Sequence, residues 1–219
     1  MHGVAPRLIV FDLDGTLVDS RGDLADSMNR LLASCGAEPL SEETIGRLVG
    51  EGATTLVRRA FEQAHREPPA DALDRFLAIY HEHLLDRTRP YRGIPEVLGQ
   101  LRARAALAVL TNKPLDATRR VLAGLDLAPF FPDDRVVGGD GPFARKPDPA
   151  GLRHLMAAAS ATPAETTLVG DSMIDWRTGK NAGVRVCLVR YGFGFEGVPI
   201  DQVGGESIVD APDGLLRTL

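Results

Sequence analysis

Short runs of aliphatic residues alternate along the chain with longer stretches that carry apolar residues at helical spacing. Apolar runs without polar alternation are typical of strands buried on both faces, and strands that alternate with helices form parallel sheets. A doubly wound parallel α/β sheet is therefore predicted, with its ligand site just beyond the carboxyl ends of the strands. The predicted strands are Leu8–Phe11, Leu107–Leu110, Arg135–Val137, Thr167–Val169, Val184–Val189 and a shorter run, Ser207–Val209.

The interval between the first two predicted strands breaks this alternation. Residues 22–87 show helical patterning and no strand pattern, and Ser41 followed by two acidic residues is a typical helix start. Because connections in compact domains are usually only a few residues long, this stretch is predicted to be an inserted all-helical unit. We expect a Rossmann-like core of residues 1–19 and 91–219 and a small helical cap domain of residues 20–90.

The composition is that of an ordinary globular protein, with 44% hydrophobic and 25% charged residues. The net charge of −5 and the lack of a basic stripe argue against a nucleic-acid partner. No apolar run reaches the roughly 18 residues of a membrane span, so no membrane partner is expected. Cys35 and Cys187 are single and far apart, which is typical of a reducing compartment, and we expect a cytoplasmic monomer or homodimer.

Two carboxylates directly follow the first predicted strand. Asp12 and Asp14 are two residues apart, so their side chains point the same way while the backbone stays extended. Two adjacent negative charges are costly unless a cation joins them or one carboxyl group stays protonated. Gly15 permits a close turn after them. The alternative is an Asp-Gly turn that ends a strand, which requires neither Asp12 nor a second carboxylate.

Two further clusters have the character of a phosphate site. Thr111 and Asn112 end the second predicted strand, where a hydroxyl, an amide and free backbone N–H groups at a helix N-terminus form an anion cradle. Lys146 precedes a Pro-Asp-Pro sequence that restricts the backbone, and a lysine held rigidly near a strand end can neutralise a phosphate. The alternatives are an ordinary helix cap and a solvated surface lysine.

The fourth cluster brings two more carboxylates after a buried run. Asp171 follows the fourth predicted strand, and Mg²⁺ prefers such oxygen ligands. Asp175 lies one helical turn further on, where it can orient the ligands without binding the ion. Asp171 as a simple N-cap is the alternative. However, independent turns and caps have no reason to fall at the ends of four different strands in this order.

Taken together, these motifs resemble those of the haloacid-dehalogenase-like superfamily, and the helical insertion is similar to the cap of one large subgroup. The matching motifs are Asp12-Leu13-Asp14-Gly15-Thr16, Thr111-Asn112, Lys146-Pro147 and Gly170-Asp171-Ser172-Met173-Ile174-Asp175. Within the superfamily, three segments resemble bacterial phosphoglycolate phosphatases: Leu17-Val18-Asp19-Ser20, Val49-Gly50-Glu51-Gly52-Ala53 and Tyr191-Gly192-Phe193-Gly194.

The resemblance implies a Mg²⁺-dependent phosphomonoester hydrolase that works through an aspartyl-phosphate. Asp12 would be the nucleophile, and Asp14 would protonate the leaving group and then deprotonate the attacking water. Mg²⁺ would be bound by Asp12, the backbone carbonyl of Asp14 and Asp171, with Asp175 behind them. The phosphate oxygens would be held by Thr111, the Asn112 backbone and Lys146.

The substrate is expected to be a small phosphorylated metabolite, in the first place a carboxylate such as 2-phosphoglycolate. Such a carboxylate needs a cation opposite the phosphate, and Arg47, beside Gly50 and Gly52 of the cap, is the candidate. Sugar phosphates, amino-sugar phosphates and nucleotides are alternative substrates. A sugar-phosphate mutase and a non-catalytic phosphoryl-binding domain are alternative functions. The second carboxylate, Asp14, argues against a dehalogenase, and the lack of any Lys in residues 20–90 argues against Schiff-base chemistry.

Overall fold

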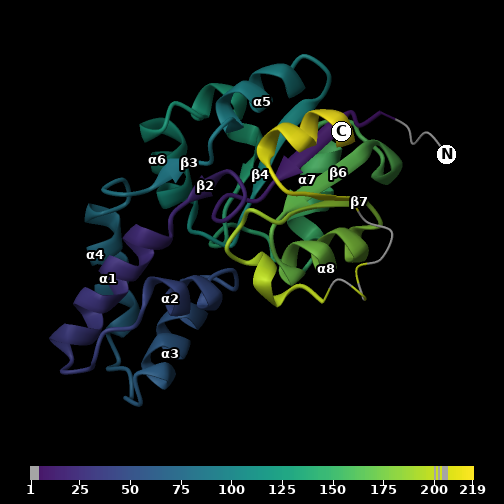
Figure 1. Cartoon of the computed structure of the whole chain (residues 1–219). Helices are drawn as coiled ribbons and strands as arrows, with labels where there is room; N and C mark the ends of the chain where they lie inside the picture. The colour runs from purple at the N-terminus through teal and green to yellow at the C-terminus, as the bar shows by residue number, and fades with distance from the viewer. Residues whose placement is uncertain (1–4, 200, 202, 204–206) are drawn as a thin grey trace.

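A six-stranded parallel sheet forms the centre of the structure, as the sequence pattern predicts. The computed structural model describes residues 5–199, 201, 203 and 207–219, so residues 1–4, 200, 202 and 204–206 of the expected core lie outside it. The strand order is β5-β4-β1-β6-β7-β8 (Figure 1). The strands are β1 (Leu8–Phe11), β4 (Ala106–Leu110), β5 (Val136–Val137), β6 (Thr166–Gly170), β7 (Arg185–Val189) and β8 (Ser207–Val209).

Helices cover both faces of this sheet, which makes it doubly wound. Residues 9, 11, 107 and 109 pack with α5, α6 and α9 on one face, whereas residues 8, 10, 108 and 110 pack with α7 and α8 on the other. Alternate residues of each strand thus face opposite layers, which explains why the strands read as unbroken apolar runs. The helices are α5 (Ile94–Leu101), α6 (Leu115–Gly124), α7 (Ala150–Ala158), α8 (Met173–Ala182) and α9 (Leu215–Thr218).

The third and fifth predicted strands begin one residue later than expected, whereas the second and fourth begin one residue earlier. Arg135 closes a short 3₁₀ turn, and the third predicted strand starts at Val136. The apolar side chains of β5 are buried, whereas Arg135 lies outside the ladder with β4. The 3₁₀ turns of the described residues are Ala128–Phe130, Asp133–Arg135, Pro163–Glu165, Phe195–Gly197 and Pro212–Gly214.

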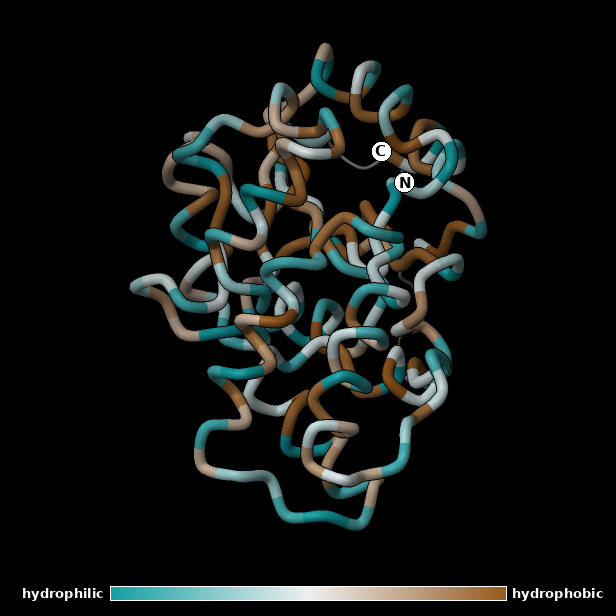
Figure 2. Tube along the Cα trace, turned by 90° about the vertical axis from the view of Figure 1, so that its left-hand side faces the viewer, coloured by the Kyte–Doolittle hydropathy of each residue, from teal (hydrophilic) through white to brown (hydrophobic). Residues whose placement is uncertain are grey.

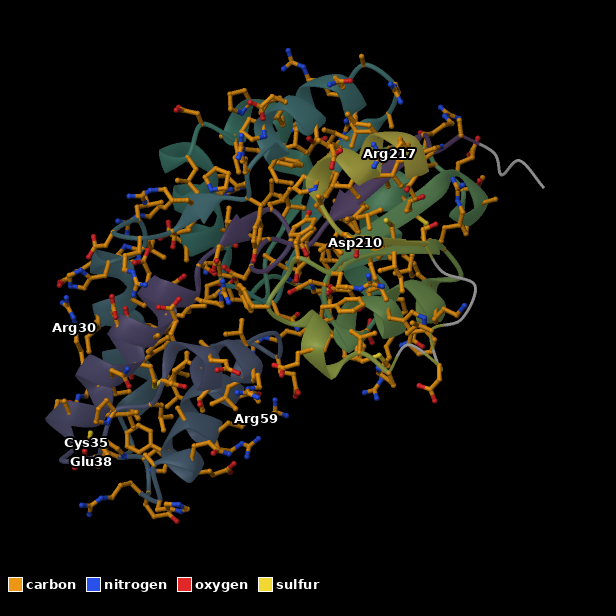
Figure 3. All side chains as sticks on the ribbon, in the orientation of Figure 1. Arg30, Cys35, Glu38, Arg59, Asp210 and Arg217 are labelled. Atoms are coloured by element: carbon orange, nitrogen blue, oxygen red, sulfur yellow. The ribbon has the colours of Figure 1, made fainter. Side chains whose placement is uncertain are left out.

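Four helices form the insertion, and Figure 1 shows them as a group to one side of the sheet. Short antiparallel strands, β2 (Val18–Asp19) and β3 (Arg89–Pro90), pair where the chain leaves and re-enters the core. Arg30, Cys35 and Glu38 lie at the end of the insertion that is remote from the sheet (Figure 3). The helices are α1 (Arg21–Ser34), α2 (Glu42–Leu48), α3 (Ala53–Gln63) and α4 (Ala72–Glu82).

Apolar side chains join the insertion to the core. Met28, Leu31 and Phe61 are fully buried in the same hydrophobic cluster as Phe11 and Leu13. In Figure 2, hydrophobic stretches (brown) lie toward the centre of the molecule, while the loop at the bottom of the view is mostly hydrophilic (teal). Within the described residues, no helix combines the length and the apolar character that crossing a bilayer requires.

Candidate active site

The carboxyl ends of β1, β4 and β6 are level with one another, so the residues that follow them meet at one edge of the sheet. Phe11 is in register with Val109 of β4 and Val169 of β6. The backbone N–H of Asp12 donates to the carbonyl of Val169 at 2.9 Å. This register places Asp12 beside Asp171, although 159 residues separate the two along the chain.

Three buried carboxyl groups form the centre of the site. Asp12, Asp171 and Asp175 each place one ligand oxygen within 4.8 Å of the other two. Burial raises the pKa of Asp12 to about 7, because lost hydration outweighs the lowering effect of Lys146, and it raises the pKa of Asp171 well above its usual value. Oδ1 of Asp12 forms an ion pair with Lys146 but accepts no hydrogen bond in good geometry among the described residues. A buried, oxygen-only cluster suits a hard divalent cation, so these residues could hold a metal ion.

Lys146 supplies the positive charge in this cluster. Its Nζ lies 2.8 Å from Oδ1 of Asp12 and 2.6 Å from Oδ1 of Asp175. Burial alone would lower the pKa of the ammonium group, but the two carboxylates raise it above its usual value. The other oxygen of Asp175 accepts hydrogen bonds from the N–H and hydroxyl of Ser172 at 3.1 and 2.6 Å, a capping box at the start of α8. Asp175 is thereby fixed and holds Lys146 against Asp12.

A glycine-rich loop closes around Asp171. The N–H of Gly194 donates to Oδ2 of Asp171 at 2.7 Å. Gly15 has a φ of 87°, and a Cβ there would lie 2.0 Å from the same carboxylate oxygen, so only glycine fits. A Cβ on Gly192 would lie 2.3 Å from the carbonyl oxygen of Gly15. The Tyr191–Gly194 segment was predicted only as a point of family resemblance, and its contact with the site was not predicted from the sequence.

Asn112 joins three loops around the site. Its Oδ1 accepts from the backbone N–H of Lys146 at 2.9 Å, and its Nδ2 donates to the carbonyls of Lys146 at 3.0 Å and Gly50 at 2.8 Å. The hydroxyl of Thr111 accepts from the N–H of Lys113 at 3.2 Å. The side chain of Asn112 is therefore occupied in holding the loops, which leaves its backbone for a ligand.

Asp14 lies beside the cluster but has partners of its own. The hydroxyl of Ser20 donates to its Oδ1 at 2.6 Å, and Nζ of Lys113 lies 2.9 and 3.1 Å from its two oxygens. Lys113 also donates a hydrogen bond to the hydroxyl of Tyr80 in α4. Neither Lys113 nor Tyr80 was predicted as a site residue. The available signal was that Lys113, one of only three lysines, directly follows Asn112.

A cavity of about 320 Å³ lies between these groups and the insertion. Asp12, Asp14, Thr111, Asn112 and Lys113 line its core side. The insertion contributes a mostly apolar wall, and Gly50 and Gly52 belong to that wall as expected from their place in the sequence. The apolar residues of the wall are Leu24, Val49, Ala53, Leu56, Leu73, Phe76 and Leu77.

The expected cap cation, Arg47, does not line this cavity. It is half-exposed, lies 2.7 Å from Glu43 and 3.6 Å from Glu196, and borders a separate, smaller depression. Arg145 lines the cavity instead, from the core side, and its Nε donates to the carbonyl of Gly139 at 2.6 Å. Arg145 was not predicted as a site residue, because only the adjacent Lys146 was assigned a role in that motif.

Comparisons with known proteins show which family this chain is similar to. The family described as haloacid dehalogenase-like hydrolase matches residues 9–189. The phosphoglycolate phosphatase of Rhodospirillum rubrum is 41% identical over 94% of this chain and 87% of its own length, and that of a Cupriavidus necator plasmid is 36% identical over 94% and 90%.

A solved structure gives the same result for the fold. The crystal structure of a Haemophilus somnus protein, described as a predicted phosphoglycolate phosphatase, is 32% identical and superposes with a TM-score of 0.88 over 97% of each chain. Family and relatives together make the chain a phosphoric monoester hydrolase. The chain thus belongs to the haloacid dehalogenase-like hydrolase family.

Proposed function

We propose that the chain hydrolyses 2-phosphoglycolate with the help of Mg²⁺ and through a phosphoryl group carried on Asp12. The observation that carries the proposal is the meeting of Asp171 and Lys146 with Asp12, which lines a cavity that Arg145 also lines. Relatives that are named phosphoglycolate phosphatase and align over most of this chain support the choice of substrate.

The chemistry uses two carboxyl groups. A carboxylate oxygen of Asp12 forms a bond to phosphorus while the bond to the leaving oxygen breaks, and the carboxyl group of Asp14 gives its proton to that oxygen. Water then attacks the phosphorus, Asp14 takes back a proton from it, and the bond between Asp12 and phosphorus breaks. Both side chains line the cavity, which gives substrate access to them.

The remaining groups offset the negative charge of the phosphate. Mg²⁺, held by Asp12, Asp171 and the backbone carbonyl of Asp14, would screen the phosphate dianion from the attacking carboxylate. Lys146, the hydroxyl of Thr111 and the backbone of Asn112 bind the phosphate oxygens, on which negative charge spreads in the transition state. The division into a core of residues 1–19 and 91–219 and a cap of residues 20–90 belongs to this proposal, and the narrow β2–β3 connection supports it.

The carboxylate of the substrate requires a cation, and Arg145 fits this role better than Arg47. Within the described part of the chain, Arg145 forms no ion pair and its guanidinium group borders the cavity next to Gly52. Arg47 already pairs with two glutamates outside the cavity. An arginine presents paired N–H groups that match a carboxylate, so Arg145 is assigned to the carboxylate end of the substrate.

A pair of substrates and a pair of variants test this proposal. Ethyl phosphate matches 2-phosphoglycolate but lacks the charged carboxylate. We expect Arg145→Gln to lower kcat/KM for 2-phosphoglycolate about 10- to 100-fold and to leave ethyl phosphate unaffected, because a charged hydrogen bond is lost. Arg47→Gln is the matched control and changes neither value. A wild-type enzyme that hydrolyses both esters equally well would refute the substrate assignment.

The covalent step has its own test. Wild-type enzyme is quenched in acid while it turns over a substrate with a radiolabelled phosphoryl group. The quenched wild-type enzyme should carry the label, and quenched Asp12→Asn should not. Retained turnover in Asp12→Asn would overturn the mechanism. No Mg²⁺-dependent turnover of any phosphomonoester by folded protein would favour a phosphoryl-binding domain instead.

The size of the cavity favours a second group of substrates. About 320 Å³ with an apolar wall on the insertion side leaves room for esters larger than 2-phosphoglycolate. Sugar phosphates, amino-sugar phosphates and nucleotides therefore belong in the same panel. A larger ester with the highest kcat/KM would replace 2-phosphoglycolate as the substrate.

A further inference from the structure

A buried ammonium group lies next to Asp14, and the proposed chemistry does not use it. Lys113 follows Asn112 at the carboxyl end of β4, and only 4% of its side chain is exposed. Its Nζ lies within 3.1 Å of both oxygens of Asp14. Because lysines are almost never fully buried unless they are paired, this contact is specific rather than incidental.

The third contact of this ammonium group comes from the insertion. Tyr80 of α4 accepts a hydrogen bond from Nζ of Lys113 at 2.5 Å, and the ammonium group lies 4.6 Å from the centre of the tyrosine ring. The ring is stacked on Phe76 of the same helix at 5.7 Å. A fixed aromatic residue of the insertion therefore holds a lysine of the core, and that lysine holds Asp14.

Charge states are consistent with this chain of contacts. Burial alone would lower the pKa of Lys113, but Asp14 and Tyr80 raise it above its usual value, so the ammonium form persists. Burial raises the pKa of Tyr80 to about 12, which keeps its hydroxyl neutral. The neutral hydroxyl accepts from the ammonium group and leaves the positive charge to face Asp14.

We propose that Lys113 is a positioning residue for Asp14 and that Tyr80 makes this positioning depend on the helical insertion. The inference rests on the role of Asp14 given under Proposed function. Ser20 holds only one oxygen of Asp14, whereas Lys113 contacts both and fixes the plane of the carboxyl group. When Asp14 has given its proton to the leaving oxygen, the ammonium group stabilises the carboxylate that remains. A shift of α4 would remove Tyr80 and loosen this arrangement.

Two esters with different leaving groups separate positioning of the acid from a structural role. Ethyl phosphate expels an alkoxide that must be protonated, whereas p-nitrophenyl phosphate expels a stable phenolate that need not be. We expect Lys113→Met to lower kcat/KM for ethyl phosphate about 100-fold and that for p-nitrophenyl phosphate less than about threefold. Tyr80→Phe, which removes only the hydroxyl, should show the same selectivity with a loss of about tenfold for ethyl phosphate.

A double variant shows whether Lys113 acts through Asp14. Asp14→Asn alone should reproduce the selective loss, and adding Lys113→Met to it should cost no more than about twofold further, because the acid is already absent. Two controls match the substitutions. Lys180→Met removes an exposed lysine of α8, and Tyr91→Phe removes a buried hydroxyl that has no hydrogen-bond partner among the described residues. Both should leave the ratio of the two kcat/KM values unchanged.

Other outcomes overturn the proposal. An equal loss with both esters means that Lys113 is only structural, and a loss confined to substrates with a carboxylate means that it binds substrate directly. Thermal unfolding shows whether Lys113→Met is misfolded. If it is, the ratio of the kcat/KM values of Tyr80→Phe for the two esters tests the proposal instead. Failure of the proposed function itself would look different, because Asp12→Asn would then retain activity toward p-nitrophenyl phosphate.

Discussion

The side-chain amide of Asn112 donates a hydrogen bond to the backbone carbonyl of Gly50 at 2.8 Å, and this contact joins the end of β4 to the loop before α3. The same side chain makes two hydrogen bonds to the backbone of Lys146. One buried amide thus connects the insertion, the end of β4 and the loop that carries Lys146. The geometry of these three segments therefore depends on the side chain of Asn112, which takes no part in the proposed chemical steps.

Asn112→Ala should therefore destabilise the protein. The substitution leaves the buried N–H and carbonyl of Lys146 without their partners, and we expect a loss of about 2 kcal/mol in the free energy of unfolding, measured with urea. Asn181→Ala is the matched control, since Asn181 donates an exposed hydrogen bond to the carbonyl of Pro147. Equal losses in the two variants would show that the three-loop connection contributes nothing special.

Gly192→Ala should be far more damaging than its size suggests. A Cβ there would lie 2.3 Å from both the Cβ of Asp171 and the carbonyl oxygen of Gly15, so the loop must move away from Asp171. We expect a loss of about 2 kcal/mol or more in stability and a weaker affinity for Mg²⁺. Gly99→Ala, in α5 with open space around it, should instead stabilise the protein by about 0.5–1 kcal/mol. Unfolding in urea and Mg²⁺ titration measure both effects.

Asp175→Asn should lower activity without unfolding the protein. Asparagine can still accept the hydrogen bonds from Ser172 that cap α8, but it removes the negative charge that holds Lys146 against Asp12. We expect kcat to fall about 10- to 100-fold with thermal stability near that of the wild type. Asp148→Asn, an exposed helix-start aspartate in the neighbouring loop, is the control and should keep full activity. A fully active Asp175→Asn would contradict this account of Lys146.

Most of the fold was predictable because its signals are local. The buried strands are unbroken apolar runs, and the long interval without strand pattern can only be an insertion, so both were predicted from residue order alone. The convergence of Asp12 with Asp171 was also predictable, because parallel strands of one sheet end at the same edge. The start of β5 was predicted one residue too early. Arg135 directly precedes the apolar run, but it closes a 3₁₀ turn and does not pair with β4.

The contacts between insertion and core were not predictable in the same way. Tyr80 is separated from Lys113 by β3, α5 and β4, and nothing in either segment marks the partner in the other. Arg47 and Arg145 illustrate the same limit. Both are arginines near glycines or prolines, and only the packing of the insertion on the core decides which of them borders the cavity.

The carboxylate cluster predicts a stability that depends on both pH and Mg²⁺. Burial raises the pKa of Asp12 from 3.8 to about 7, so the folded protein binds this proton more tightly than the unfolded chain does. A raised carboxyl pKa stabilises the folded state fully below the unfolded value, and this contribution is lost as pH rises through about 7. Without metal, Asp12 thus destabilises the protein at alkaline pH, and Asp12→Asn should raise its Tm at about pH 8.

Mg²⁺ should have the opposite pH dependence, because protons compete with the cation for the same oxygens. The rise in Tm on adding Mg²⁺ is expected to be larger at about pH 8 than at about pH 5.5. Asp171→Asn should abolish most of the rise, whereas Asp133→Asn, whose side chain is 90% exposed, should keep it. Scanning calorimetry with Mg²⁺ and with EDTA at both pH values measures the difference. An equal rise at both pH values, or one that persists in Asp171→Asn, would mean that the cation binds elsewhere.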